Sequence, residues 1–192
     1  DSWSTPYWVG STASTGFNNG TSTTIFGQWT HVLCTRQGTD ARWFVNGRLL
    51  GYQSRSGAID HQTGIPLAIG FGGATSEQPF TGYVSSGRIN IGYVPTGYQT
   101  SSTTIGTQIF TPPTSPVTLT SQGSLANSVS LLMNFTDAAI IDSTGRNVIE
   151  TVNEARVNTA ASKFGGSSMY FNASSGTRLQ IPSVSANPIF NM

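Results

Sequence analysis

Short runs in which apolar and polar positions alternate cover much of the chain, and glycine, asparagine or proline separates one run from the next. The clearest runs predict three strands, over Trp29–Arg36, Ala41–Val45 and Arg48–Gln53, because aromatic and β-branched residues recur there at nearly every second position. The Asn46-Gly47 pair predicts a type I′ turn, since both residues tolerate the positive φ that this turn requires. These runs therefore predict an antiparallel meander.

The same alternation predicts further strands on both sides of a proline-rich stretch. Pro66–Phe71 and Phe80–Tyr93 precede this stretch, and Val129–Phe135 follows it. Residues 111–127 contain three prolines and no aromatic residue, and proline cannot donate a hydrogen bond to a sheet, so we expect a linker there. The predicted division of this all-β chain is 1–110, 111–127 and 128–192.

Several motifs in the first part resemble, in their order, the second half of a laminin G-like domain of the concanavalin A-like superfamily. The stretches that carry this resemblance are Trp29–Val32, Thr35–Gly38, Phe44–Gly47, Pro66–Gly70, Phe80–Ser85, Arg88-Ile89, Tyr98 and Phe110–Thr114. The chain most resembles the variety of this domain that occurs in virion proteins of tailed phages, particularly marine cyanophages. The resemblance implies an antiparallel two-sheet jelly-roll sandwich.

Residues 128–192 resemble the first half of the same domain, so the two halves occur in reverse order. The motifs are Val129–Phe135, Asp142–Gly145, Lys163–Gly166, Tyr170-Phe171 and Leu179–Pro182. Either the chain is a window from a tandem array, which ends one domain and begins the next, or it is a circular permutant whose two segments close one sandwich. The absence of the family's Phe-Thr-x-Glu-x-Trp-Val strand pair favours the array.

Composition narrows the range of partners. Charged residues make up 9% of the chain, and the formal net charge is only +1. Binding of nucleic acid requires clustered Lys and Arg, whereas the cationic residues here are scattered. No apolar run approaches the ~20 residues of a membrane span. We therefore expect neither nucleic acid nor a membrane as a partner, and we expect Cys34, inside a predicted strand, to be a small buried hydrophobe.

Catalysis is not expected from this sequence. Retaining glycoside hydrolysis requires two carboxylates about 5 Å apart, and in the superfamily that the chain resembles they alternate on one strand. No two of the eight acidic residues share a predicted strand at a spacing of two. The sequence also lacks a Gly-x-Ser-x-Gly motif, and neither histidine lies in a recognisable motif. We therefore expect a protein that is not an enzyme.

Aromatic residues supply the predicted glycan-binding site. Aromatic rings pack against the apolar faces of pyranose rings, and such residues occur near the N-terminus and in the stretch 93–109. We expect this stretch to be an exposed loop or a short hairpin, and the resemblance places it at the rim of the sandwich. The candidates are Trp3, Tyr7, Trp8, Tyr93 and Tyr98. Packing of some of the first three into the core is the alternative interpretation.

The resemblance also implies a calcium ion at the rim, since laminin G-like domains often hold one with carboxylates and carbonyl groups. Asp137 and Asp142 lie in the matching loop and are the candidate ligands. At later positions of the family pattern, however, Asn172 and Thr177 replace acidic residues. Asp142 is equally suited to an Asx-turn. Calcium is thus one alternative, and no other cofactor is expected.

The resemblance gives two expected functions. The first is a non-catalytic structural or adhesion module on a virion surface, such as a capsid decoration, appendage or tail-fibre protein. Its partners would be other virion proteins, copies of itself in a homo-oligomer, and host-surface polysaccharide. The alternative is a calcium-dependent, lectin-like carbohydrate-binding domain of an extracellular cellular protein.

Overall fold

The computed structural model describes the chain in separate ranges. The backbone alone is described for residues 7–10, 13–16 and 18–19, and side chains as well for residues 27–57, 66–70, 80–136, 139–172 and 176–182. The chain divides into two compact units. Unit 1 comprises residues 1–60, 93–113 and 122–124, and unit 2 comprises residues 61–92, 114–121 and 125–192. Within the described ranges, no helix has the length and apolar character needed to cross a membrane.

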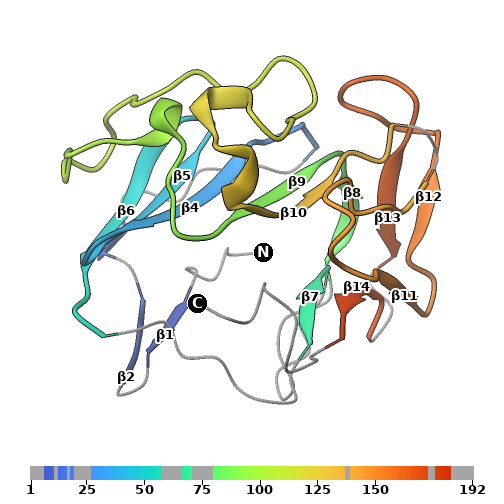
Figure 1. Cartoon of the computed structure of the whole chain (residues 1–192), viewed down its shortest axis with the longest axis horizontal. Coiled ribbons are helices and arrows are strands. Elements are labelled where there is room, and N and C mark those ends of the chain that lie inside the picture. The colour runs from blue at the N-terminus through green and yellow to red at the C-terminus, as the bar shows by residue number, and fades with distance from the viewer. Residues whose placement is uncertain are drawn as a thin grey trace. The chain divides into compact units, whose positions relative to one another are not determined.

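The described part of unit 1 is built on a four-stranded antiparallel sheet in the order β3-β6-β5-β4, of which Figure 1 labels β6, β5 and β4. The strands are β3 (Asn18–Asn19), β4 (Val32–Gln37), β5 (Asp40–Val45) and β6 (Arg48–Ser54), and a separate hairpin pairs β1 (Tyr7–Gly10) with β2 (Ala13–Gly16). The predicted turn between β5 and β6 is confirmed, because φ is positive at both Asn46 (51°) and Gly47 (80°).

The stretch after residue 93 packs onto this sheet within unit 1. It contains the 3-10 helix η1 (Thr96–Tyr98) and then runs along the start of β6, where the Leu49 N–H donates to the Thr107 carbonyl over 2.9 Å and the Ile109 N–H donates to the Gly47 carbonyl over 2.9 Å. A cluster of rings fills the space between them. Its members are His31, Phe44, Tyr98 and Phe110. The predicted exposed loop is therefore confirmed for much of this stretch, but the prediction is wrong for Tyr98, which is buried in unit 1.

The described residues of unit 2 form three antiparallel sheets, with the orders β12-β13-β8, β11-β14-β7 and β10-β9. The strands are β7 (Leu67–Ile69), β8 (Thr81–Val84), β9 (Gly87–Asn90), β10 (Val129–Met133), β11 (Glu150–Val152), β12 (Arg156–Asn158), β13 (Ser168–Asn172) and β14 (Arg178–Ile181). In Figure 1 the green strands β7, β8 and β9 each lie beside a yellow to red strand from much later in the sequence.

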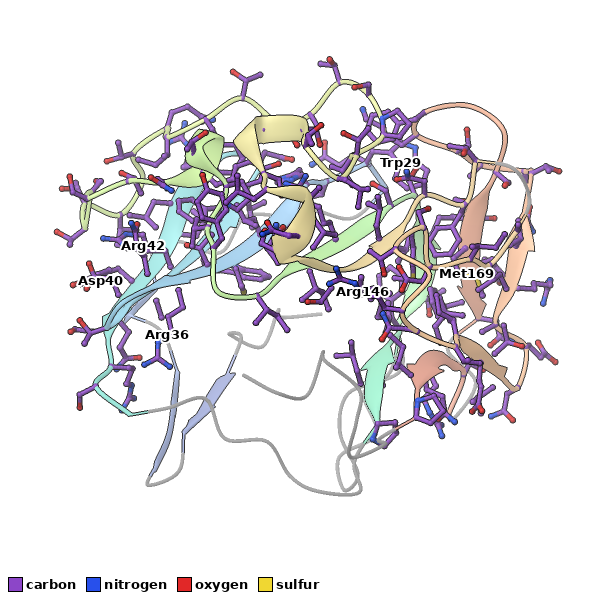
Figure 2. All side chains as sticks on the ribbon, viewed as in Figure 1. Trp29, Arg36, Asp40, Arg42, Arg146 and Met169 are labelled. Carbon is purple, nitrogen blue, oxygen red and sulfur yellow. The ribbon has the colours of Figure 1, made fainter. Side chains whose placement is uncertain are left out.

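The core of unit 2 combines both stretches of sequence. Its buried members are Leu131, Met133, Phe135, Ala155, Met169, Phe171, Leu179 and Ile181. Met169, labelled in Figure 2, is fully buried on β13. Leu67, Ile69, Val84 and Ile89 from the earlier strands pack against this core. The all-β fold that we predicted is thus confirmed.

The proline-rich stretch 111–127 contributes buried residues. Val117 is 8% exposed and packs with Val129 and Leu132 in a small second cluster. Arg88 on β9 donates hydrogen bonds to the Thr118 and Ser121 carbonyls over 2.8 and 2.9 Å. Two further 3-10 helices, η2 (Ser121–Gly123) and η3 (Ala126–Ser128), lie at its end. The domain boundaries that we drew around this stretch stay a prediction.

Cys34 does not occupy the buried position that we expected. Its side chain is exposed on β4, the last strand of the unit 1 sheet. Alternation places Cys34 on the same face of β4 as Val32, which is 42% exposed. An alternating pattern identifies the two faces of a strand, but it does not say which face the core covers.

Candidate functional site

A row of three side chains crosses the sheet β12-β13-β8 in unit 2. Tyr170 on β13 lies directly opposite Arg156 on β12 and opposite Tyr83 on β8. The centroids of the two tyrosine rings are 5.2 Å apart, and their planes are inclined by 43°. The guanidinium carbon of Arg156 lies 4.9 Å from the centroid of the Tyr170 ring, within the range of a cation–π contact. We call these three residues the aromatic ladder.

The aromatic ladder lies on the face of this sheet that points away from the core. The adjacent row is Val157, Met169 and Val84, and all three belong to the core of unit 2. Because successive side chains of a strand point to opposite faces, the ladder residues point the other way. Arg156 is exposed and both tyrosines are half-buried. The sheet therefore presents aromatic surface beside a cation.

Polar side chains lie next to the ladder on the same face. Asn172 follows Tyr170 by two positions on β13 and lies opposite Thr81 on β8. Its amide donates a hydrogen bond to the carboxylate of Glu154, and its carbonyl oxygen accepts one from the hydroxyl of Thr177 over 3.1 Å. These contacts fix the orientation of the Asn172 amide. Glu154 itself is exposed, so its carboxylate can accept further hydrogen bonds.

The ladder and its polar neighbours place hydrogen-bonding groups beside aromatic rings. Arg156 is held over Tyr170 and also donates a hydrogen bond to the Glu154 carbonyl over 3.3 Å. A carboxylate, an amide and a guanidinium beside two aromatic rings can pair with hydroxyl groups and pack on an apolar face. The carboxylate described beside the ladder is that of Glu154.

The glycan-binding residues predicted from the sequence are not brought together in the described structure. Trp3 lies outside the described residues, and for Tyr7 and Trp8 only the backbone is described, paired with Gly16 and Thr15 on β2. Tyr93 is half-buried in unit 1.

Tyr98 does not present a ring face for a sugar. It is 4% exposed, and its ring packs against Phe110 at 4.7 Å and against His31 at 6.0 Å between centroids. Tyr98 is the last residue of the 3-10 helix η1 and its buried residue, so its side chain points into unit 1. Tyr98 is therefore a core residue, and its ring is not accessible to a glycan.

Asp142 is buried and serves as the centre of a turn. Its Oδ1 accepts hydrogen bonds from the Leu132 and Thr144 N–H groups, both over 3.0 Å. Its Oδ2 accepts bonds from the Thr144 hydroxyl over 2.6 Å, and from the Asn147 N–H and amide over 3.1 and 2.7 Å. Burial acts to raise the pKa of this carboxyl, but the hydrogen bonds from Thr144, Leu132 and Asn147 outweigh it and hold the pKa below its ordinary value.

These contacts leave little of the Asp142 carboxylate for a calcium ion. Each oxygen already accepts at least two hydrogen bonds, which is close to its full capacity. The second predicted ligand, Asp137, lies outside the described residues. In the part of the chain that the structure describes, no group of three or more His, Cys, Asp or Glu side chains is placed to hold a metal ion. The Asx-turn interpretation of Asp142 is confirmed.

A second polar cluster, in unit 1, has a structural role. Arg42 on β5 is 3% exposed, and its guanidinium contacts the Asp40 carboxylate over 2.9 Å and the Ser102 carbonyl over 3.0 Å (Figure 2). The Tyr52 hydroxyl donates to Asp40 over 3.1 Å, and this bond raises the pKa of Tyr52. Arg42 also lies over the Tyr52 ring, 5.3 Å from its centroid. Every group here is engaged with another, so the cluster fixes the 93–110 stretch against β5 and β6.

The comparisons with known proteins agree with the fold. The all-β structure with several antiparallel sheets is consistent with a concanavalin A-like or laminin G sandwich. Residues 1–90 match the family described as the concanavalin A-like lectin/glucanases superfamily, Laminin_G_3. No curated protein and no solved structure matches the chain. The resemblance that we inferred over the first part of the chain is thus supported for residues 1–90.

The aromatic ladder is the part of the candidate site that sequence reasoning missed. The alternation of Thr81 and Tyr83 with Gly82 and Val84 could have shown that Tyr83 faces away from the core. Its partner Tyr170, however, lies much later in the sequence, and the register between the two strands carries no local signal.

Proposed function

We propose that this protein is a non-catalytic carbohydrate-binding module that contacts its ligand through the aromatic ladder. The observation that supports this proposal is the single row of Tyr83, Tyr170 and Arg156 on the outward face of one sheet. The match of residues 1–90 to a superfamily of lectins and glucanases is in accord with it. Fold alone does not define function, so the proposal depends on this row.

The chemistry of the ladder suits a sugar ring. The C–H-rich face of a pyranose would pack on the ring of Tyr83 or Tyr170. Hydroxyl groups at the edge of the sugar would donate to the Glu154 carboxylate and accept from the Arg156 guanidinium. The hydrogen bond from Asn172 to Glu154 holds that carboxylate in place before the ligand arrives, which reduces the entropy lost on binding.

Binding can be measured by isothermal titration calorimetry with oligosaccharides first selected on a glycan array. We expect Tyr83→Ala and Arg156→Met each to weaken binding about 10-fold, which corresponds to about 1.4 kcal/mol. Arg48→Met, at an exposed arginine on β6 in unit 1, is the matched control and should bind like the native protein. Unchanged affinity in both ladder variants, each correctly folded by circular dichroism, would reject the ladder as the site.

The proposed location and partners of this protein rest on the resemblance to phage virion proteins. We propose an adhesion module on a virion surface, with copies of itself and other virion proteins as partners and host polysaccharide as the ligand. The alternative, an extracellular lectin-like domain of a cellular protein, predicts calcium-dependent binding. Titration of the same oligosaccharide in the presence of a chelator separates the two: unchanged affinity supports the virion module, and lost affinity supports the calcium-dependent lectin.

A further inference from the structure

The strands between residues 67 and 90 form no sheet of their own among the described residues. β7 pairs with β14, β8 pairs with β13, and β9 pairs with β10. None of the three early strands pairs with another described strand from its own stretch. The sheets of unit 2 are therefore completed only when the stretch 67–90 meets the stretch 129–181.

The hydrophobic core of unit 2 is also made from these two stretches of sequence. Among the residues that the structure describes, the eight buried members of the larger core come from residues 131–181, and the early stretch adds four partly buried residues that pack against them, Leu67, Ile69, Val84 and Ile89. Separation of the two stretches would return apolar surface to water on both sides, at about 25 cal/mol for each Å². Each stretch thus needs the other as a partner.

The connection between the two stretches is long compared with the pairing that it serves. Asn90 at the end of β9 lies opposite Val129 at the start of β10, so a short hairpin could join them. Instead the chain runs from Ile91 to Ser128 before it returns. Much of this connection folds within unit 1, and contacts between stretches so far apart in sequence form slowly. A second copy of the chain offers the same strands in the same register, and it competes with the tethered stretch once the protein concentration approaches the effective concentration within one chain.

We propose that copies of this chain exchange these stretches, so that residues 129–181 of one copy pair with residues 67–90 of a second copy. The register, the core and the apolar contacts would be those seen within one chain. Reciprocal exchange closes a dimer, and exchange in one direction extends a row of copies. This surface is defined by backbone pairing and packing, so it does not depend on carbohydrate binding.

A disulfide placed across the two stretches reports the arrangement directly. Ala68 and Gln180 lie opposite each other on β7 and β14, and opposed residues of antiparallel strands have Cα atoms about 4.5–5.5 Å apart, within the range of a disulfide. The variant Ala68→Cys/Gln180→Cys is made in a Cys34→Ser background. It is then refolded and oxidised at protein concentrations from about 1 μM to about 1 mM, which approach the effective concentration of a tethered segment.

Exchange predicts that non-reducing gels show a cross-linked monomer at the lowest concentration, and a growing share of disulfide-linked dimers and larger species as the concentration rises. A cross-linked monomer at every concentration would overturn the proposal. The control is Glu150→Cys/Gln180→Cys, whose cysteines face each other on β11 and β14 within the later stretch and should give monomer in either arrangement. If the first variant fails to refold, light scattering of the native protein refolded at the same concentrations decides: only a monomer at all of them rejects exchange.

Discussion

Asp142 shows how one side chain can hold several backbone groups. It is 4% exposed and accepts hydrogen bonds from Leu132, Thr144 and Asn147. Asp142→Asn would replace one acceptor oxygen with an N–H₂ group that faces N–H donors. We expect the free energy of unfolding to fall by about 1–3 kcal/mol, the usual cost of an unsatisfied buried group, as measured by urea denaturation. Ser143→Ala, at the exposed neighbouring position, is the control and should change it little.

The depressed pKa of Asp142 also predicts a dependence on pH. The pKa of this carboxyl is lower in the folded state than in the unfolded chain, where it is about 3.9. Its contribution to stability is therefore fully present above the unfolded pKa, and it is lost as the pH falls through the folded pKa. Denaturation curves of the native protein and Asp142→Asn should differ most above pH ~5 and converge as the pH drops below ~4. A difference that grew in acid would contradict this account.

Gly47 is needed for two separate reasons. Its φ of +80° lies in the left-handed region, and a Cβ there would lie 1.9 Å from the Phe110 carbonyl oxygen. Gly38 has a φ of +58°, but a Cβ there would meet no atom within 4 Å. We expect Gly38→Ala to lower the melting temperature modestly, since backbone strain costs about 1–2 kcal/mol, and Gly47→Ala to lower it much further. Equal effects of the two substitutions would show that the Phe110 contact does not matter.

At the scale of elements, the turn 142–147 closes an edge of β10. One edge of this strand pairs with β9. Beside β10, Arg146 donates to the Val129 carbonyl over 3.2 Å (Figure 2), and the Asn147 amide donates to the Ser130 carbonyl over 2.7 Å. These side chains thus hydrogen-bond to backbone carbonyls that an exposed strand edge would present to another strand.

This arrangement predicts a defect in Arg146→Ala/Asn147→Ala. Loss of the two side chains leaves two strand carbonyls without these donors and also removes the hydrogen bond from the Asn147 amide to Asp142. We therefore expect faster aggregation on heating and a loss of about 1 kcal/mol of stability for each bond. The onset of light scattering during a thermal ramp measures the first effect. Arg48→Ala, on an exposed position of β6, is the control. An onset unchanged from that of the native protein would show that the turn does not protect this edge.

The strands themselves could be predicted because the residues that favour each strand and turn are close together in the sequence. Alternation identified β4, β5, β6 and β10 within a few residues, and the Asn46-Gly47 pair fixed the turn. What failed depended on contacts across the sequence. Tyr98 was expected at an exposed rim, yet Phe110 and His31 enclose it. The ladder formed by Tyr83 and Tyr170 depends on a register between distant strands, which no local pattern encodes.

For the whole molecule, low charge governs behaviour in solution. The formal net charge is +1 at pH 7, and the isoelectric point of the sequence is about 8.1. Proteins associate most readily where their net charge vanishes. We expect solubility, measured by precipitation with polyethylene glycol, to be lowest near pH 8 and to rise towards pH 5, as the histidines and then carboxylates gain protons. A minimum far from pH 8 would mean that local patches, not net charge, control association.

The dependence of β7, β8 and β9 on much later strands has a consequence during synthesis. These strands leave the ribosome first. The partner of β9 follows after roughly 40 more residues and those of β8 and β7 after roughly 90 and 110, which takes about 2–20 s at ordinary translation rates. Throughout that interval, the side chains of Leu67, Ile69, Val84 and Ile89 have no core to pack against. A chain paused on the ribosome in this state is a natural client for chaperones, and the pace of translation from Ile91 to Ile181 sets how long it needs them.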